Sequence, residues 1–302
     1  MSVHADPLVS IVTPSLNQGR FIRDNIESVK RQTYQRTEHL IMDGGSTDET
    51  RDVVTPYIDE DRLRWYSEPD AGQADAVNRG ISRVRGSIVG WLNSDDAYFD
   101  ETAIERVVDT FRTSPDLDVC YGHVAYIDEC NELLMVKSVA RFSRTRLLRG
   151  CFLEQPGVFV RRRALEGESP LEIDLAYAMD YELWLRLSHK HEFRLINCVI
   201  AADRTHPTRK MVLGAAPMAS ESAAVARGAG FQANRRESLF RAADHCVLGI
   251  GRRIRGLQLA LMICTGRIPA AVRVRCGNSL FVRQLSAWNP RRLGMQGQRD
   301  AT

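Results

Sequence analysis

Two adjacent carboxylates, Asp95 and Asp96, follow an apolar run at residues 87–92. Neighbouring negative charges repel each other, and the end of a buried strand gives them little hydration. Water in an exposed turn would offset this cost, and so would a divalent cation, because Mg²⁺ and Mn²⁺ favour carboxylate oxygens. The pair is therefore either a solvated turn or part of a metal site.

Polar clusters follow three other apolar runs of the chain as well. The runs at residues 8–13, 39–43, 63–68 and 87–92 are expected strands, and the clusters after them are TPSLNQG, DGGSTD, EPDAGQAD and NSDD. A fifth strand is expected at 118–127, and apolar residues at helical spacing lie between the strands. This alternation predicts an α/β fold with a doubly wound, mostly parallel sheet. Ligands of such sheets bind beyond the carboxyl ends of the strands, so the clusters together favour a binding site over four separate turns.

Neither of the usual phosphate-binding glycine motifs, GxGxxG and GxxxxGK[ST], occurs in these clusters. A nucleotide diphosphate would be repelled by acidic loops unless a metal ion lay between them. This requirement favours the cation over the solvated turn, with Mg²⁺ or Mn²⁺ held by Asp96 and neutralising a diphosphate leaving group.

Six stretches, in chain order, resemble the family 2 glycosyltransferases of the GT-A fold. They are VSIVTPSLNQGRFI, LIMDGGSTDET, DAGQADAVNRG, WLNSDD, EQPGVFVRR and AMDYELWLRL. The resemblance extends from about residue 8 to about residue 210, and its joint pattern is specific although each stretch alone is weak. It implies an inverting transfer from a UDP- or dTDP-sugar to a hydroxyl of a glycan or lipid-linked acceptor, with Mn²⁺ or Mg²⁺. Synthesis of a cell-surface polysaccharide would use such a reaction.

The resemblance also assigns residues to the nucleotide. It implies that Asp43 accepts a hydrogen bond from the imide N–H of uracil or thymine. Thr13 and Pro14 would border the base, and Asp75 would lie along the nucleotide.

NSDD takes the place of the family's DxD motif. The resemblance then puts Asp95 near the ribose and Asp96 on the metal, but Asn93 stands one residue before the motif's usual start, which leaves the register open by one residue. A segment at 202–210 is similar to the family's RxHP region. It would place His206 on the metal and Arg209 or Lys210 on the diphosphate.

Asp180 supplies a second carboxylate for chemistry. It stands at the start of an expected helix over 178–187, where an Asp is a common N-cap. Its alternative role, which the resemblance supports, is the general base that takes the proton of the acceptor hydroxyl. Family members often carry an acidic pair where this chain has Met179 and Asp180. The resemblance further makes Glu154 and Gln155 contacts of the sugar or the acceptor.

The composition is that of an ordinary globular protein, with 302 residues and a formal net charge of +3. Seven cysteines without a CxxC pair indicate a reducing compartment and argue against disulfides and zinc. No signal peptide and no apolar run of about 18 residues is evident. We expect a cytoplasmic protein, or one bound to the cytoplasmic face of a membrane.

The charge is divided unevenly along the chain. After residue 204 there are 16 Lys and Arg against four acids, whereas the residues before hold 25 basic and 34 acidic side chains. We expect a GT-A domain at 1–210 and a helical, basic extension at 211–302 whose last dozen or so residues are disordered. Apolar residues at helical spacing over 247–261 would lie on an anionic membrane or pack on the domain.

Other functions fit less well. A protein that binds a nucleotide sugar without catalysis would not need Asp180. A nucleic-acid-binding protein should interleave aromatic residues with the arginines of its tail, and this tail has few. A nucleotidyltransferase should have a basic glycine-rich loop after the first strand, and TPSLNQG is not basic.

Overall fold

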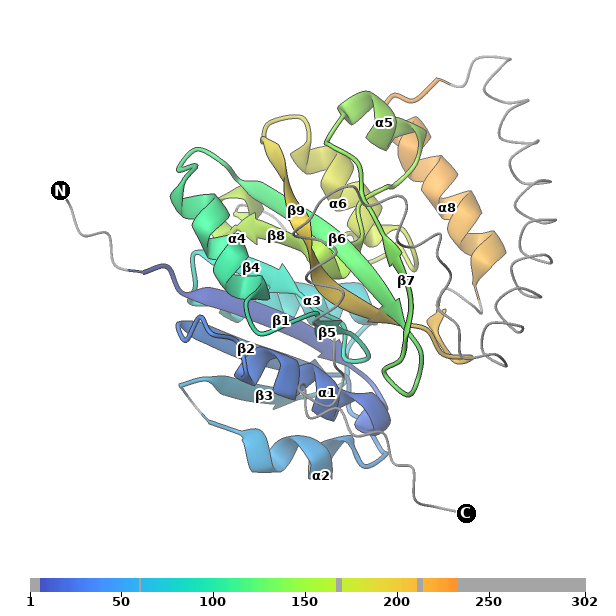
Figure 1. The fold of residues 1–302 in the computed structure, drawn as a ribbon. Helices are drawn as coiled ribbons and strands as arrows, with labels where there is room; N and C mark the ends of the chain where they lie inside the picture. Colours follow the sequence, from blue (N-terminus) through green and yellow to red (C-terminus); the bar gives the residue numbers. More distant parts are fainter. Residues whose placement is uncertain (1–5, 60, 167–169, 211–213, 233–302) are drawn as a thin grey trace.

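The computed structural model describes residues 6–59, 61–166, 170–210 and 214–232 (Figure 1). Its strands are β1 (Val9–Ser15), β2 (Thr37–Asp43), β3 (Leu63–Ser67), β4 (Ile88–Trp91), β5 (Ala97–Tyr98), β6 (Val119–Ile127), β7 (Leu133–Lys137), β8 (Val158–Arg161) and β9 (Phe193–Arg204). Its α-helices are α1 (Gly19–Lys30), α2 (Thr50–Val54), α3 (Gln73–Arg83), α4 (Ala103–Arg112), α5 (Arg144–Arg149), α6 (Met179–Leu187) and α8 (Ala215–Gly228). Short 3₁₀ turns are η1 (Thr55–Tyr57), η2 (Gln155–Gly157) and η3 (Arg162–Leu165).

In the described part of the chain the strands form one sheet, in the order β3-β2-β1-β4-β8-β6-β9-β5, with β7 beside β6. β3, β2, β1 and β4 are parallel to one another, and β6 is parallel to β9. The predicted α/β fold is therefore confirmed. β8 is antiparallel to both β4 and β6, which the sequence did not predict. Because β8 is antiparallel to both of its neighbours, β4 and β6 run in the same direction. The carboxyl ends of β1, β4, β6 and β9 therefore lie along one edge of the sheet.

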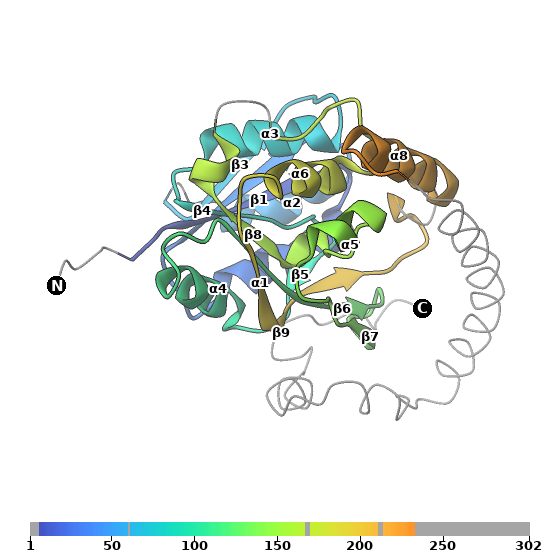
Figure 2. The ribbon, with the colours of Figure 1, turned by 90° about the horizontal axis from the view of Figure 1, so that it is seen from above.

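Helices cover both faces of the sheet (Figure 2). α3 and α6 lie on one face, whereas α1 and α4 lie on the other. Successive residues of a strand point to opposite faces, so Val12 joins the core layer of Leu183 while Ile11 joins that of Phe111. Because β1 is packed on both faces, the loop at its carboxyl end starts from a fixed position.

α8 is the described part of the predicted extension, and it packs against α6. The predicted helix over 247–261 and the tail lie outside the described residues. Across the segments that are described, no helix has both the length and the apolar character needed to cross a membrane.

Glu38 of β2 links the neighbouring strands β1 and β3 through hydrogen bonds to their side chains. Its side chain is 1% exposed and accepts hydrogen bonds from Ser10 Oγ at 2.5 Å, Arg64 Nη2 at 2.7 Å and Arg85 Nε at 2.8 Å. Burial raises the pKa of Glu38, but the hydrogen bonds from Ser10 and Arg85 outweigh it and hold that pKa below the ordinary value. The ionised carboxylate therefore stabilises the fold.

We expect Glu38→Gln to lower the free energy of unfolding at pH 7 by about 2 kcal/mol, the size of a hydrogen bond to a charged group. The contribution is fully present above the unfolded-state pKa of about 4.3 and is lost as the pH falls through the lower folded-state pKa. The difference from the parent protein should thus shrink at pH 3. Urea unfolding at both pH values measures it, with the exposed Glu132→Gln as control. Equal stability of the two variants at pH 7 would contradict this role.

Candidate active site

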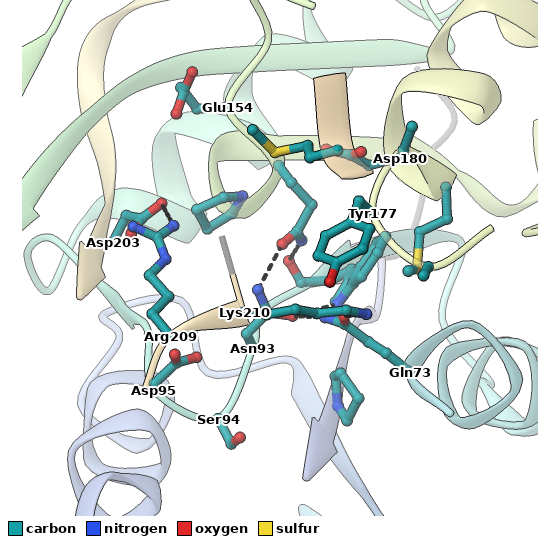
Figure 3. A pocket seen from close by; sticks show the side chains of 18 of the residues that line it. Gln73, Asn93, Ser94, Asp95, Glu154, Tyr177, Asp180, Asp203, Arg209 and Lys210 are labelled. Carbon is teal, nitrogen blue, oxygen red and sulfur yellow. Dashed lines mark hydrogen bonds and ion pairs between the residues drawn. The ribbon is translucent and has the colours of Figure 1, made fainter. Parts of the chain in front are cut away.

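A cavity of about 570 Å³ opens where the carboxyl ends of four strands meet (Figure 3). Each of these strands contributes a residue near its end: Pro14 of β1, Trp91 of β4, Tyr126 of β6 and Asp203 of β9. The start of α6 and one side of α8 complete the wall. The predicted position of the site, beyond the carboxyl ends of the strands, agrees with this arrangement.

The carboxylate turn, residues 93–96, directs only one of its two aspartates into the cavity. Asp95 lines the cavity, and its Oδ2 lies 3.0 Å from Nε2 of His206. Asp96 is 2% exposed and does not line it. Its Oδ1 accepts a hydrogen bond from the backbone N–H of Arg204 at 3.0 Å, and its Oδ2 accepts one from Asn93 at 3.3 Å. The structure thus places Asp95, and not the predicted metal ligand Asp96, in the cavity wall, because both carboxylate oxygens of Asp96 accept hydrogen bonds from Arg204 and Asn93.

Asp203, which sequence reasoning missed, adds a third carboxylate. It is 4% exposed, and its Oδ2 accepts a hydrogen bond from Arg209 at 2.6 Å. Its Oδ1 is buried and has no hydrogen-bond partner among the described residues. Burial raises the pKa of Asp203 to about 6 although Arg209 opposes the shift. Burial, and then the charges of Asp203 and Asp95, also raise the pKa of Asp96.

These groups fit a divalent cation that is shared with a substrate. Within the described segments no cluster of three or more His, Cys, Asp or Glu could enclose a metal ion by itself. Asp95 and His206 offer an oxygen and a nitrogen 3.0 Å apart, and the unpartnered oxygen of Asp203 belongs to the same cavity. Mg²⁺ is typically held by one or two carboxylates together with substrate phosphates, so two protein ligands are sufficient. His206 Nδ1 lies 2.9 Å from Thr208 Oγ1, which orients the ring.

Arg204 stabilises the carboxylate turn through a hydrogen bond to its backbone. Its side chain is fully buried, and its Nε donates to the backbone oxygen of Asp95 at 2.9 Å. The guanidinium also contacts Asp24 of α1 at 3.0 Å and Asn131 of the β6–β7 turn at 2.6 Å. The position of Asp95 thus depends on segments that are far apart in the sequence.

Three of the predicted nucleotide contacts lie outside the cavity wall. Thr13 is fully buried, with its hydroxyl 2.8 Å from His39 Nε2. Asp75 forms an ion pair with Arg79 at 2.8 Å. Asp43 is 2% exposed, and its carboxylate accepts three hydrogen bonds, two from Ser46 and one from Ser67. The described cavity is instead lined on this side by Pro14, as predicted, and by Ser15, Leu16, Asp70 and Gln73.

Asp180 lines the cavity from the first turn of α6 and is half-buried. It is not the N-cap, a position held by Ala178, and its Oδ1 accepts a hydrogen bond from the adjacent backbone N–H of Tyr181 at 2.7 Å. Burial raises the pKa of Asp180 to about 6, and the charges of Glu154 and Glu221 act in the same direction. Figure 3 shows Asp180 and Asp95 on opposite sides of the cavity.

Glu154 and Gln155, the predicted contacts of the sugar or the acceptor, both line the cavity, and each already has hydrogen-bond partners within the protein. Glu154 accepts a hydrogen bond from Tyr126 at 2.7 Å and forms an ion pair with Lys137. Gln155 accepts a hydrogen bond from Asn93 at 3.1 Å and donates one to the backbone of β4. Gln155 therefore orders the carboxylate turn.

Two cations lie on the Asp95 side and at the centre of the cavity (Figure 3). Arg209 pairs with Asp203, and Lys210 Nζ donates to Gln73 at 3.3 Å. Burial lowers the pKa of Lys210. Both predicted diphosphate contacts are thus cavity residues, and the cavity combines carboxylates, an imidazole and several cations, Lys137 among them.

Comparisons with known proteins identify the family of the chain. The family Glycosyl transferase family 2 matches residues 10–166. An uncharacterized glycosyltransferase of Rickettsia typhi is 27% identical over 213 residues, which are 66% of this chain and 64% of that protein. Chondroitin synthase of Escherichia coli is 31% identical over 193 residues, or 63% of this chain and 28% of the synthase. The chain therefore spans less than two thirds of the length of either relative.

A solved structure shares the fold. Glucosyl-3-phosphoglycerate synthase from Mycobacterium tuberculosis, in complex with Mn²⁺, UDP-glucose and phosphoglyceric acid, has a TM-score of 0.51 and 17% identity. The likeness covers 73% of this chain and 80% of that one.

Proposed function

Because this chain belongs to glycosyl transferase family 2, we propose that its cavity transfers a sugar, with inversion, from a UDP- or dTDP-sugar to a hydroxyl of a glycan or lipid-linked acceptor. The observation that carries the proposal is one cavity with the Asp95–His206 pair on one side and the half-buried Asp180 on the other. The resemblance to a chondroitin synthase supports a role in polysaccharide synthesis. The arginine-rich sequence after residue 232 supports action at the cytoplasmic face of an anionic membrane.

The Asp95 side of the cavity is suited to the diphosphate of the donor. Asp95 and His206 would hold Mn²⁺ or Mg²⁺, and the cation would neutralise the charge that develops on the leaving diphosphate. Arg209 and Lys210 add positive charge beside it. Asp203 keeps Arg209 in place through their 2.6 Å ion pair.

Asp180 is suited to activate the acceptor. Its carboxylate takes the proton of the acceptor hydroxyl while that oxygen forms a bond to the anomeric carbon. The bond from the anomeric carbon to the diphosphate oxygen breaks, and its electron pair leaves with the nucleoside diphosphate. Attack from the face opposite the diphosphate inverts the anomeric centre. A pKa of about 6 leaves Asp180 ionised at neutral pH and basic enough to accept a proton.

A protein that only binds nucleotide sugars is the alternative. It would have no use for Asp180, whose burial in the cavity wall disfavours the ionised carboxylate. Ionisable groups with shifted pKa values are concentrated at catalytic sites, so the raised pKa of Asp180 favours an enzyme over a binding protein.

A release assay with a panel of UDP-, dTDP- and GDP-sugars tests the function. We expect one class of donor to release its nucleoside diphosphate in the presence of Mn²⁺ and a glycan acceptor, and EDTA to stop the release. Asp180→Asn, assayed in parallel, controls for contaminating hydrolases. Tight binding of a nucleotide sugar by calorimetry, without turnover for any donor or acceptor, would favour the non-catalytic alternative.

A further inference from the structure

One carboxylate of α8 binds the backbone that leads into α6. Glu221 accepts hydrogen bonds from three successive backbone N–H groups, those of Ala176 at 2.6 Å, Tyr177 at 2.5 Å and Ala178 at 2.9 Å. α6 begins at the next residue, Met179. Backbone N–H groups at the start of a helix have no partner within the helix, and the helix dipole favours a negative charge there. From a different helix, Glu221 binds the N–H of the N-cap residue, Ala178, and places a negative charge at the start of α6.

The bound loop, residues 176–178, is part of the cavity wall. All three of its residues line the cavity, as do Met218 and Ser222 of α8. Asp180 follows the loop by two residues. Figure 1 shows α8 alongside α6, and the two helices are in contact. The backbone that carries Asp180 is therefore held by a segment beyond residue 210, where the sequence predicted the domain to end.

We propose that Glu221 is a positioning residue for sugar transfer: it fixes the loop at 176–178 and, through the start of α6, the place of Asp180 in the cavity. The inference rests on the proposed function, because it assigns Glu221 a role in the step that Asp180 performs. Glu221 acts on Asp180 through its hydrogen bonds to the backbone of the loop at 176–178 and through its negative charge.

The charge of Glu221 adds an effect that can be measured. The groups that face Asp180 are Glu154 ahead of η2, Glu221 of α8, Lys210 after β9 and Cys151 after α5. Burial is the largest cause of the raised pKa of Asp180, followed among the charges by Glu154 and then Glu221. Loss of the negative charge at Glu221 should thus lower the pKa of Asp180.

Glutamine is an informative replacement because it keeps the size of the side chain. A carboxylate only accepts hydrogen bonds, whereas an amide presents one oxygen and an NH₂ group that donates. In Glu221→Gln the NH₂ group would meet converging backbone N–H donors, so the loop should shift. Glu221→Asp keeps the charge but is one methylene shorter. Glu172→Gln, on an exposed residue of the same connection, is the matched control.

The experiment measures single-turnover rates of the full chain from pH 5 to 8 with the donor found in the release assay. We expect Glu221→Gln to lower the rate at pH 7.5 by about 10- to 100-fold, as misplacement of a catalytic group does. The acidic limb of its pH profile should move to lower pH, and donor affinity should stay within about twofold. Glu221→Asp should lose part of the rate with the limb in place, and Glu172→Gln should match the parent.

The outcomes separate this inference from the function it rests on. If the parent protein shows no turnover, the proposed function is wrong, and the failure is seen before any Glu221 variant is compared. A Glu221→Gln variant with the parent's rate and acidic limb overturns the positioning role, even if its melting temperature falls. If circular dichroism shows that Glu221→Gln does not fold, Glu221→Asp decides: a reduced rate with an unmoved limb supports the role, and the parent's rate overturns it.

Discussion

Asp180→Asn is expected to lower the rate of sugar transfer by about 10²–10⁴-fold, because an amide cannot accept the proton of the acceptor hydroxyl. Donor affinity should stay within a few-fold of the parent value, since the base acts on the acceptor and not on the nucleotide. Single-turnover kinetics and calorimetric titration with the donor measure the two quantities. This combination separates an enzyme from a protein that only binds the donor.

The pH dependence follows from the raised pKa of Asp180. Turnover of the parent should fall as the pH drops through about 6, because the protonated carboxyl cannot act as a base. Stability has the opposite sign. An Asp whose pKa is raised by folding stabilises the fold at low pH, and this contribution is lost as the pH rises through about 6. Asn keeps the hydrogen bond from Tyr181 without the buried charge, so Asp180→Asn should not lower the melting temperature at pH 7.5.

Turnover of Asp180→Asn within about threefold of the parent would exclude Asp180 as the general base. Three other carboxyls would then be candidates. Glu182 forms an ion pair with Arg186, and Asp174 is exposed. Neither lines the cavity, whereas Glu154 does. Glu154 would therefore be the residue to replace next.

Asp95→Asn is expected to weaken Mn²⁺ binding by more than about 100-fold, because the loss of a group that only orients a ligand already costs about 10- to 100-fold. Binding of the donor should then no longer depend on Mn²⁺. Electron paramagnetic resonance detects free Mn²⁺ directly, so the result does not depend on turnover. The expectation follows from Asp95 facing His206 across 3.0 Å in the cavity wall.

Asp96→Asn is the matched control for the register of the carboxylate turn. The amide oxygen of the replacement side chain can still accept the 3.0 Å hydrogen bond from the backbone of Arg204, and only the longer 3.3 Å hydrogen bond from Asn93 is lost, so the turn should persist. We expect this variant to bind Mn²⁺ like the parent. Loss of Mn²⁺ binding in Asp96→Asn, with binding retained in Asp95→Asn, would restore the register that assigns the metal to Asp96.

The sheet was largely predictable from local sequence. Strands predicted at 8–13, 39–43 and 118–127 correspond to β1, β2 and β6, because continuous apolar runs are typical of strands packed on both faces. β9 was not predicted as a strand, because it alternates irregularly between buried and exposed residues before its apolar end.

The site was less predictable, because its geometry depends on contacts between distant segments. From the sequence alone, either Asp95 or Asp96 could face a ligand. The hydrogen bond from the backbone N–H of Arg204 in β9 to Asp96 decides between them. Asp203 had a usable signal, a lone carboxylate at the end of an apolar run and within the segment at 202–210 that contains His206. Glu221 had none, since its function depends on a loop more than forty residues earlier in the chain.

Arg204 also determines how the molecule can open. Its buried guanidinium binds Asp24, Asn131 and the backbone of Asp95, and separation from Asp24 would leave the charge of Arg204 unpaired in the interior at a cost of several kcal/mol. These segments should therefore separate together, in the larger and rarer openings of the native state, and not one at a time. On the opposite wall, the loop at 176–178 is held by a half-buried carboxylate, Glu221, so opening there should cost less than separating the segments that Arg204 binds.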